Sequence, residues 1–187
     1  MTDFYHGDDK FPYPMGLIQM LGKTDVHMLR KGAPKMMPDK GVAKMAKHSI
    51  DFFLTTEDLP LYDNRVALTD DGSIQLIYQK TNEKAAEQLR ERLKGMLTAI
   101  GCENHLMPCA VYLGNKIPLA GVAHQAGTLR FGDDPKEAVL DINCRIHGVT
   151  NCYVVDSSFF WSASAVNPTL TIVANALRVA EQMKGVV

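Results

Sequence analysis

The chain has 187 residues, 46% of them hydrophobic, and a formal net charge of −1. A chain of this length and composition is expected to fold as one large globular domain, or a domain and a half, with a real hydrophobic core. The near-zero net charge argues against binding to nucleic acid or to an acidic membrane surface, and neither is expected as a partner.

The first ten residues are acidic and polar and do not resemble a secretory signal peptide, so we expect a cytoplasmic protein. Residues 157–177 carry no charge over 21 positions, which is long enough to cross a bilayer. Nine serine, asparagine, proline and threonine residues interrupt this stretch. We therefore interpret it as a polar loop followed by a buried helix, not as a membrane span.

The four cysteines form no C-x-x-C pair; they are Cys102, Cys109, Cys144 and Cys152. His105 lies between the first two, but this spacing matches no common zinc pattern. We therefore expect reduced, partly buried thiols and no metal site.

Residues 1–40 are rich in glycine, proline and methionine and are expected to be mostly irregular, with a short strand at residues 17–21. Residues 49–56 have the composition of a strand. In residues 65–78 apolar side chains alternate on two arms around Asp71-Gly72, and this pattern predicts a β-hairpin.

Residues 82–100 predict an amphipathic helix, with Asn82 as its N-cap and Gly101 just past its end. Apolar residues recur on one face at steps of three and four, and charged residues fill the other. The apolar positions are Ala86, Leu89, Leu93, Met96, Leu97 and Ile100. We expect this helix to lie on a sheet, and residues 109–113 to form one more strand.

The C-terminal third has a different character. Residues 120–135 form a glycine-punctuated loop, and residues 152–156 predict a short apolar strand that ends at Asp156. A loop over residues 157–166 and a helix over residues 168–181 follow. Strand, acid, loop and helix start, in this order, are typical of the ligand-binding edge of an α/β sheet.

The start of this last helix is well defined in the sequence. Asn167 suits the N-cap, and Pro168 suits the first helical position, where a missing N–H has no consequence. The helix is apolar on nearly all sides, which predicts burial. The plainest interpretation is a core helix with a good cap, although its free N–H groups and partial positive charge also suit an electron-rich ligand.

Two titratable residues stand out. His124 lies in a glycine-containing loop, where a lone histidine is usually structural or exposed; imidazole is also the side chain best suited to exchange a proton near neutral pH, and the other five histidines have less suggestive settings. Three roles are open to Asp156: capping the loop that follows, bonding a ribose-like hydroxyl, or joining a hydrolase triad with a serine and His124. No G-x-S-x-G elbow accompanies Asp156, which weakens the triad, and neither G-x-G-x-x-G nor a phosphate loop occurs.

Several longer stretches of the sequence indicate a function more specifically than these single residues and spacings do. The stretches in question are H124-Q-A-G-T-L-R-F-G132, Asp134-Pro135, V139-L-D141, R145-I-H-G-V-T-N-C-Y-V-V-D-S-S-F159 and N167-P-T-L-T171. Together they resemble the C-terminal signature of the glucose–methanol–choline (GMC) family of flavin-dependent oxidoreductases. A looser likeness extends to N64-R-V-A-L68 and to the helix predicted at 82–100.

The resemblance implies an enzyme that binds FAD and oxidises alcohols or sugars, with hydride passing to the flavin. It implies that His124 takes the hydroxyl proton of the substrate and that Asn167 bonds the same oxygen. The cofactor-binding residues that it implies are Asp156, Ser157, Asn167, Pro168 and Thr169. A helix start directed at the flavin would stabilise the negative charge that develops there on reduction.

The implied fold is of mixed α/β class. A substrate-side antiparallel sheet with helices would occupy residues 1–122. A flavin-facing segment would occupy residues 123–187, and its strand, loop and helix would complete a Rossmann-like FAD domain.

The family begins with a dinucleotide-binding βαβ unit and its glycine fingerprint, and this sequence contains neither. The sequence therefore resembles the C-terminal portion of such an enzyme, as a fragment, a truncated product or one subunit. The expected partners are a small alcohol or sugar and a complementary N-terminal FAD-binding chain, or a second copy of this chain. A non-catalytic remnant that serves as a binding or assembly module is the alternative.

Overall fold

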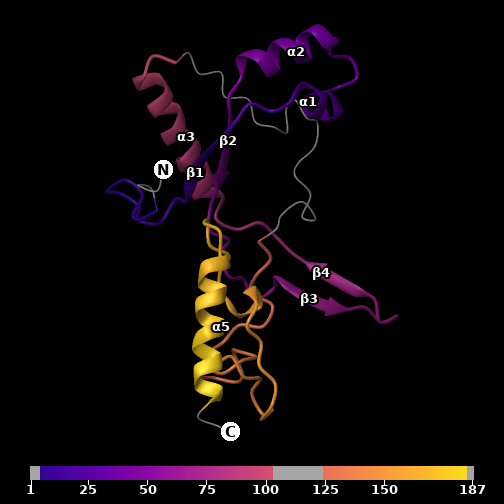
Figure 1. The fold of residues 1–187 in the computed structure, drawn as a ribbon, viewed down its shortest axis with the longest axis vertical. Helices are drawn as coiled ribbons and strands as arrows, with labels where there is room; N and C mark the ends of the chain where they lie inside the picture. The colour runs from indigo at the N-terminus through magenta and orange to yellow at the C-terminus, as the bar shows by residue number, and fades with distance from the viewer. Residues whose placement is uncertain (1–4, 103–123, 185–187) are drawn as a thin grey trace. The chain divides into compact units, whose positions relative to one another are not determined.

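The computed structural model describes residues 5–102 and 124–184 (Figure 1). The described residues form two compact units, one from residues 5–56 and 84–102 and the other from residues 57–83 and 124–184. Helices and short antiparallel strands both occur, which confirms the mixed class. The Rossmann-like detail and the division at residue 122 stay predictions, and the strand predicted at 109–113 lies outside the described residues.

The first unit is built around an antiparallel strand pair. β1 (Leu17–Gly22) pairs with β2 (Asp51–Thr55), which confirms the two strands predicted in this region. Their register places Ile18 opposite Leu54, and the ladder is irregular near Gly22. These two strands form the sheet on which the long helix of the same unit packs.

Two helices between β1 and β2 were not predicted. They are α1 (Val26–Gly32) and α2 (Asp39–His48). The Asp25 carboxylate caps α1 by accepting a hydrogen bond from the His27 N–H at 2.8 Å. Both helices are short, so neither offers a long periodic pattern in the sequence.

The amphipathic helix predicted over residues 82–100 is α3 (Glu83–Ala99). Leu89 and Leu93 are buried and pack in one cluster with Ile18 of β1 and with Met15. Partly buried hydrophobic residues of β2 contact the same cluster. The prediction that this helix lies on a sheet is therefore confirmed, although Ile100 is 74% exposed.

The C-terminal end of α3 has the glycine that the sequence predicted. Gly101 has a φ of 79°, in the left-handed region. The Gly101 N–H donates to the Thr98 carbonyl at 3.0 Å, and the Cys102 N–H donates to the Leu97 carbonyl at 2.9 Å. This pair of bonds is a Schellman motif, which satisfies carbonyls that the end of a helix leaves unpaired.

Asn82, which precedes α3, has a φ of 56°, whereas an N-cap residue is usually extended. Its side-chain amide donates a hydrogen bond to the Glu57 carbonyl at 3.0 Å. Asn82 therefore ties the chain just before α3 to Glu57, and both residues belong to the second unit. The sequence did not predict this role.

The predicted hairpin of the second unit is confirmed. β3 (Arg65–Leu68) pairs with β4 (Ile74–Ile77), and Gly72 has a φ of 79° in the turn. The register places Val66 opposite Leu76, and Leu68 opposite Ile74. These four side chains share one face of the hairpin and are 49–80% exposed.

The strand predicted at residues 152–156 is wrong. Tyr153 makes one isolated antiparallel bridge with Arg145, and the Val154 N–H donates to the Cys144 carbonyl at 2.9 Å. Single bridges, not continuous ladders, also pair Leu140 with residues 131 and 146. The apolar residues of this segment are half-buried because they pack on a cluster formed by Leu140, Cys144, Phe159 and Val179.

The C-terminal helix is α5 (Thr169–Met183), close to the predicted range. Val179 is 1% exposed, and the partly buried Ile172 packs against the same cluster. The expectation of burial on nearly all sides is wrong, because Leu170, Val173 and Leu177 are 85%, 53% and 67% exposed. No helix within residues 5–102 and 124–184 has the length and apolar character needed to cross a bilayer.

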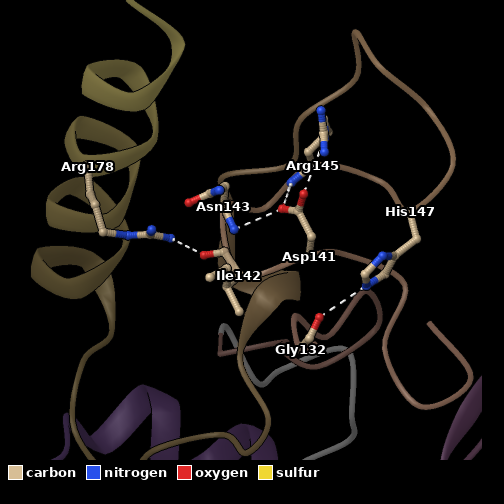
Figure 2. A network of polar contacts seen from close by, with 7 residues as sticks. All are labelled: Gly132, Asp141, Ile142, Asn143, Arg145, His147 and Arg178. Carbon is tan, nitrogen blue, oxygen red and sulfur yellow. Dashed lines mark hydrogen bonds and ion pairs between the residues drawn. The ribbon is translucent and has the colours of Figure 1, made fainter. Parts of the chain in front are cut away.

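A tight turn at residues 141–145 packs beside α5 (Figure 2). The Asp141 carboxylate accepts hydrogen bonds from the N–H groups of Asn143 at 2.8 Å and Arg145 at 3.0 Å, and from the Arg145 guanidinium at 3.2 Å. Burial raises the pKa of Asp141, but the two N–H groups and the Arg145 charge outweigh it and hold that pKa below its usual value. Cys144 takes a left-handed φ of 59° within the turn.

The glycine inside α3 and the glycine just past its end should respond to alanine in opposite directions. Gly101→Ala should lower the free energy of unfolding by about 1 kcal/mol, because alanine is strained at this positive φ. Gly95→Ala should raise it by about 0.5–1 kcal/mol, because Gly95 lies in the helix interior and an added Cβ meets nothing within 4 Å. Urea unfolding of both variants measures the difference, and a stabilising Gly101→Ala would contradict the assigned C-cap.

Asp141→Asn should remove a pH-dependent part of the stability. A depressed folded-state pKa stabilises the protein above the unfolded-state pKa of about 3.9, and this contribution is lost as the pH falls through the folded-state value. Urea unfolding should therefore show a wild-type advantage on the order of 1 kcal/mol near neutral pH that shrinks below about pH 4. The exposed Asp70→Asn variant controls for loss of a surface carboxylate.

Candidate functional site

The loop that begins at His124 is fixed to the segment around the short helix η2 (Ser157–Phe159). The Ser157 hydroxyl donates a hydrogen bond to the Gln125 carbonyl at 2.6 Å. Further along, the Leu129 N–H donates to the Ser158 carbonyl at 3.0 Å. These bonds hold residues 125–131 alongside residues 157–159, so the position of the half-buried His124 depends on η2.

Gly127 allows this close approach. Its φ is 82°, and a Cβ at this position would lie 3.3 Å from the Phe160 carbonyl oxygen. A side chain at residue 127 would therefore be strained and would press against the backbone of the neighbouring segment. The glycine that follows His124 in the motif thus has a structural reason in this chain.

Asp156 takes the first of the three roles that the sequence left open. Its carboxylate caps η2 by accepting a hydrogen bond from the Ser158 N–H at 2.9 Å, and the Ser158 hydroxyl also donates to it. The Ser158 hydroxyl and then the Ser158 N–H lower the pKa of Asp156, which is exposed. Asp156 and Ser157 therefore both have local structural contacts, and their cofactor-binding roles stay predictions.

The start of α5 differs from the predicted one. Pro168, not Asn167, is the N-cap residue, and it has helical dihedral angles with no side-chain capping bond. The first helical bond at this end joins the Ile172 N–H to the Pro168 carbonyl at 3.0 Å. The predicted capping role of Asn167 is therefore wrong; its side chain is exposed, and the first turn of α5 has no side-chain cap.

His124 and Asn167 belong to elements that pack on the same hydrophobic cluster. Partly buried Leu129 and Phe131, which follow the His124 loop, contact this cluster, as does Ile172 in the first turns of α5. Phe159 of η2 is one of its buried members. The fold thus places both sequence motifs in one unit, while the catalytic roles of His124 and Asn167 stay predictions.

A cleft of about 670 Å³ opens within the second unit, and sequence reasoning missed it. Its walls come from residues 58–66, 76–78, 126–139 and 161–163. None of the predicted site residues lines it, although Ala126 and Gly127 of the His124 loop do. No motif in the sequence indicates this cleft, because its walls meet only in the folded chain.

Aromatic and polar side chains shape the wall of this cleft. The Arg130 guanidinium lies 4.7 Å from the ring centroid of Trp161, and the Trp161 indole N–H donates to the Phe131 carbonyl at 2.6 Å. Tyr78 donates a hydrogen bond to the Asp58 carboxylate at 3.0 Å. Partial burial, and then the hydrogen bond and negative charge of Asp58, raise the pKa of Tyr78.

A metal centre has no support among the described residues, in which no group of three or more histidine, cysteine or acidic side chains could hold an ion. Cys102 is an exposed free thiol, whereas His105 and Cys109 lie outside the described residues. Cys144 is buried and Cys152 exposed, and both are free thiols.

Known proteins match the chain over most of its length. The family model for GMC oxidoreductases, in its C-terminal part, matches residues 40–176. Paromamine 6'-oxidase from Streptomyces fradiae is 48% identical over 65 residues, which are 35% of this chain and 12% of that protein. The 6'''-hydroxyparomomycin C oxidase from Streptomyces lividus is 35% identical over 132 residues, which are 65% of this chain and 22% of that protein.

The fructose dehydrogenase large subunit from Gluconobacter japonicus is 25% identical over 196 aligned positions, which cover 97% of this chain and 34% of that protein. The chain thus spans no more than about a third of these curated relatives. The matched residues include both the His124 loop and the start of α5, and they extend over more than half of the sequence. The chain therefore belongs to the GMC oxidoreductase family.

Proposed function

We propose that this chain forms the substrate-side part of an FAD-dependent oxidoreductase that acts on the CH–OH group of a small alcohol or sugar. The observation that carries the proposal is the family match over residues 40–176, which includes both His124 and Asn167. The names of relatives support this substrate class, since they include a paromamine 6'-oxidase and a fructose dehydrogenase large subunit. Paromamine and fructose are both polyhydroxylated compounds.

The residues at the start of α5 fit a flavin. This helix begins at Thr169 with no side-chain cap, so the N–H groups of its first turn are available to an external acceptor. A helix start also carries a partial positive charge, which favours an electron-rich group beside it. When bound, FAD would supply the acceptor for the hydride that leaves the alcohol carbon.

The residues of this chain would then supply proton transfer and orientation. We assign His124 the role of general base, because a neutral imidazole can accept the hydroxyl proton near neutral pH. Asn167 would orient the same substrate oxygen through its amide, which can donate or accept a hydrogen bond without a change of charge. The first turn of α5 would stabilise negative charge that grows on the flavin side.

The exposed stripe of α5, formed by Leu170, Val173 and Leu177, supports a partner. These residues recur on one helix face, opposite the face that Val179 buries. Exposed apolar side chains grouped in this way favour a protein contact. We propose that a flavin-binding part complementary to this chain covers the stripe and completes the FAD site.

His124→Ala should lower kcat on the order of a hundredfold or more in the flavin-loaded enzyme, because the variant lacks the base for the hydroxyl proton. Flavin binding, measured from the visible absorption of the bound cofactor, should change little. The exposed His48→Ala on α2 is the matched control and should behave as wild type. A variant that oxidises alcohol at the wild-type rate would remove His124 from this role.

The purified 187-residue chain should bind FAD weakly and should self-associate through the exposed stripe. Leu177→Asp should shift it toward the monomer in sedimentation velocity, and the exposed Gln182→Asp on the same helix should not. Addition of a complementary flavin-binding part should restore the bound-flavin spectrum. Tight FAD binding and alcohol turnover by the chain alone would contradict the need for that part.

A further inference from the structure

Arg178 joins α5 to the turn at residues 141–145. Its guanidinium donates to the Ile142 carbonyl at 2.9 Å, as Figure 2 shows. Two of its nitrogens also donate to the side-chain carbonyl of Asn175, one helical turn earlier, at 3.0 and 3.1 Å. The Asn175 amide in turn donates to the Cys144 sulfur at 3.3 Å. One arginine thus orients an asparagine, and the two side chains together contact two residues of the turn, Ile142 and Cys144.

The turn presents fixed partners to α5. Three hydrogen bonds to the Asp141 carboxylate and a bond from the Cys144 N–H to the Asp141 carbonyl close it. Cys144 is fully buried and has a left-handed φ of 59°. These bonds fix the backbone that carries the Ile142 carbonyl and Cys144, and burial confines the Cys144 side chain.

The same turn is linked to the His124 loop by backbone and side-chain bonds. The Cys144 carbonyl accepts the Val154 N–H at 2.9 Å. The chain then runs directly to Asp156, which caps η2, and the Ser157 hydroxyl bonds the Gln125 carbonyl beside His124 at 2.6 Å. The turn is therefore bonded to α5 on one side and is connected to the His124 loop on the other.

Apolar packing alone does not fix the position of α5 along its axis. The contacts of Val179 and Ile172 with the cluster are non-directional, and an α-helix rises only about 1.5 Å per residue, so a small slide keeps most apolar area buried. Hydrogen bonds are directional and weaken steeply outside a narrow range of distance and angle. The Arg178 and Asn175 bonds therefore set the axial position of α5 more sharply than its hydrophobic face does.

Resting on the function proposed above, we propose that Arg178 is a positioning residue for the oxidation reaction. Through Asn175, Ile142 and Cys144 it holds α5 at one axial position, and so it places Asn167 correctly relative to His124. Arginine suits this task because its planar fork donates to two acceptors at once, whereas lysine presents a point charge. A displacement of about 1 Å at a reacting centre can lower a rate on the order of a hundredfold.

The test compares Arg178→Met and Arg178→Lys with wild type in the flavin-loaded enzyme, with kcat expressed per bound flavin well below the unfolding transition. Arg90→Met is the matched control, because Arg90 is an exposed arginine on α3 whose ion pair with Glu91 measures 3.8 Å. Arg178→Met should lower kcat about tenfold or more with little change in KM, and Arg178→Lys should fall between it and wild type. Arg90→Met should retain the wild-type kcat.

A second measurement does not depend on activity. Cys144 is buried beneath Asn175 and Arg178, whereas Cys102 and Cys152 are exposed and serve as internal standards. Alkylation by iodoacetamide, followed by peptide mass spectrometry, should label Cys144 several-fold faster in Arg178→Met than in wild type or Arg90→Met. The two exposed cysteines should react at unchanged rates.

The outcomes separate this proposal from the proposed function. A wild-type enzyme that oxidises no alcohol would overturn the proposed function, and with it the positioning role, even if Cys144 labelling shows that Arg178 holds α5. If wild type is active and His124→Ala is not, a wild-type kcat in Arg178→Met overturns the positioning role alone. A lower kcat with faster Cys144 labelling supports it, and a lower kcat with unchanged labelling overturns the mechanism through α5.

Discussion

In the second unit, hydrophobic packing holds α5 through one narrow face, and the neighbouring segments pack against that face. Val179 is almost completely buried against Leu140, Cys144 and Phe159, and these three residues come from two separate segments of the chain. The segments from 129 to 160 pair through isolated bridges instead of ladders, and scattered backbone hydrogen bonds join them, such as the bond from the Gly132 N–H to the Leu140 carbonyl at 2.8 Å. Burial against Val179 of α5 adds an apolar contact that these segments share, in the same unit as the loop that carries His124.

Short polar motifs supply the precision that apolar packing lacks. Asp141 closes the turn beside α5, and Asp156 caps η2, in each case through backbone N–H groups close in sequence. The Ser158 hydroxyl and then its N–H lower the pKa of Asp156. Burial raises the pKa of Asp141, but two N–H groups and the Arg145 guanidinium outweigh it. Local hydrogen bonds thus fix the turn at residues 141–145 and the start of η2, whereas hydrophobic contacts hold the neighbouring segments. The His124 loop is bonded to η2.

The sequence predicted the elements whose pattern is local. α3, its glycine end and the β3–β4 hairpin follow from periodicity and turn chemistry that a few residues determine. The strand at 152–156 was predicted wrongly, because an apolar run records burial and does not reveal whether neighbouring segments offer a ladder. Pro168 replaced Asn167 as N-cap, since the chain enters α5 already in a helical conformation.

The candidate site was predictable only where a motif carried it. His124, Asp156 and Asn167 lie in stretches long enough to indicate a family, and the family match confirmed that resemblance. Asn175 and Arg178 gave a weaker signal, two polar residues spaced by three on a mostly apolar helix, which does not identify their contacts. The cleft beside Trp161 had no signal, because its walls are far apart in sequence.

The route of the chain between the two units has a further consequence. Residues 57–83 fold with residues 124–187, and the segment that begins at Lys84 returns to the first unit. Neither unit is therefore encoded by one uninterrupted stretch. A fragment that begins at residue 124 would lack the β3–β4 hairpin and the wall of the cleft that residues 58–66 and 76–78 form. Any dissection of this protein into autonomous modules has to rejoin two distant segments through a new linker, and an evolutionary exchange of either module needs crossovers at all three junctions between the units.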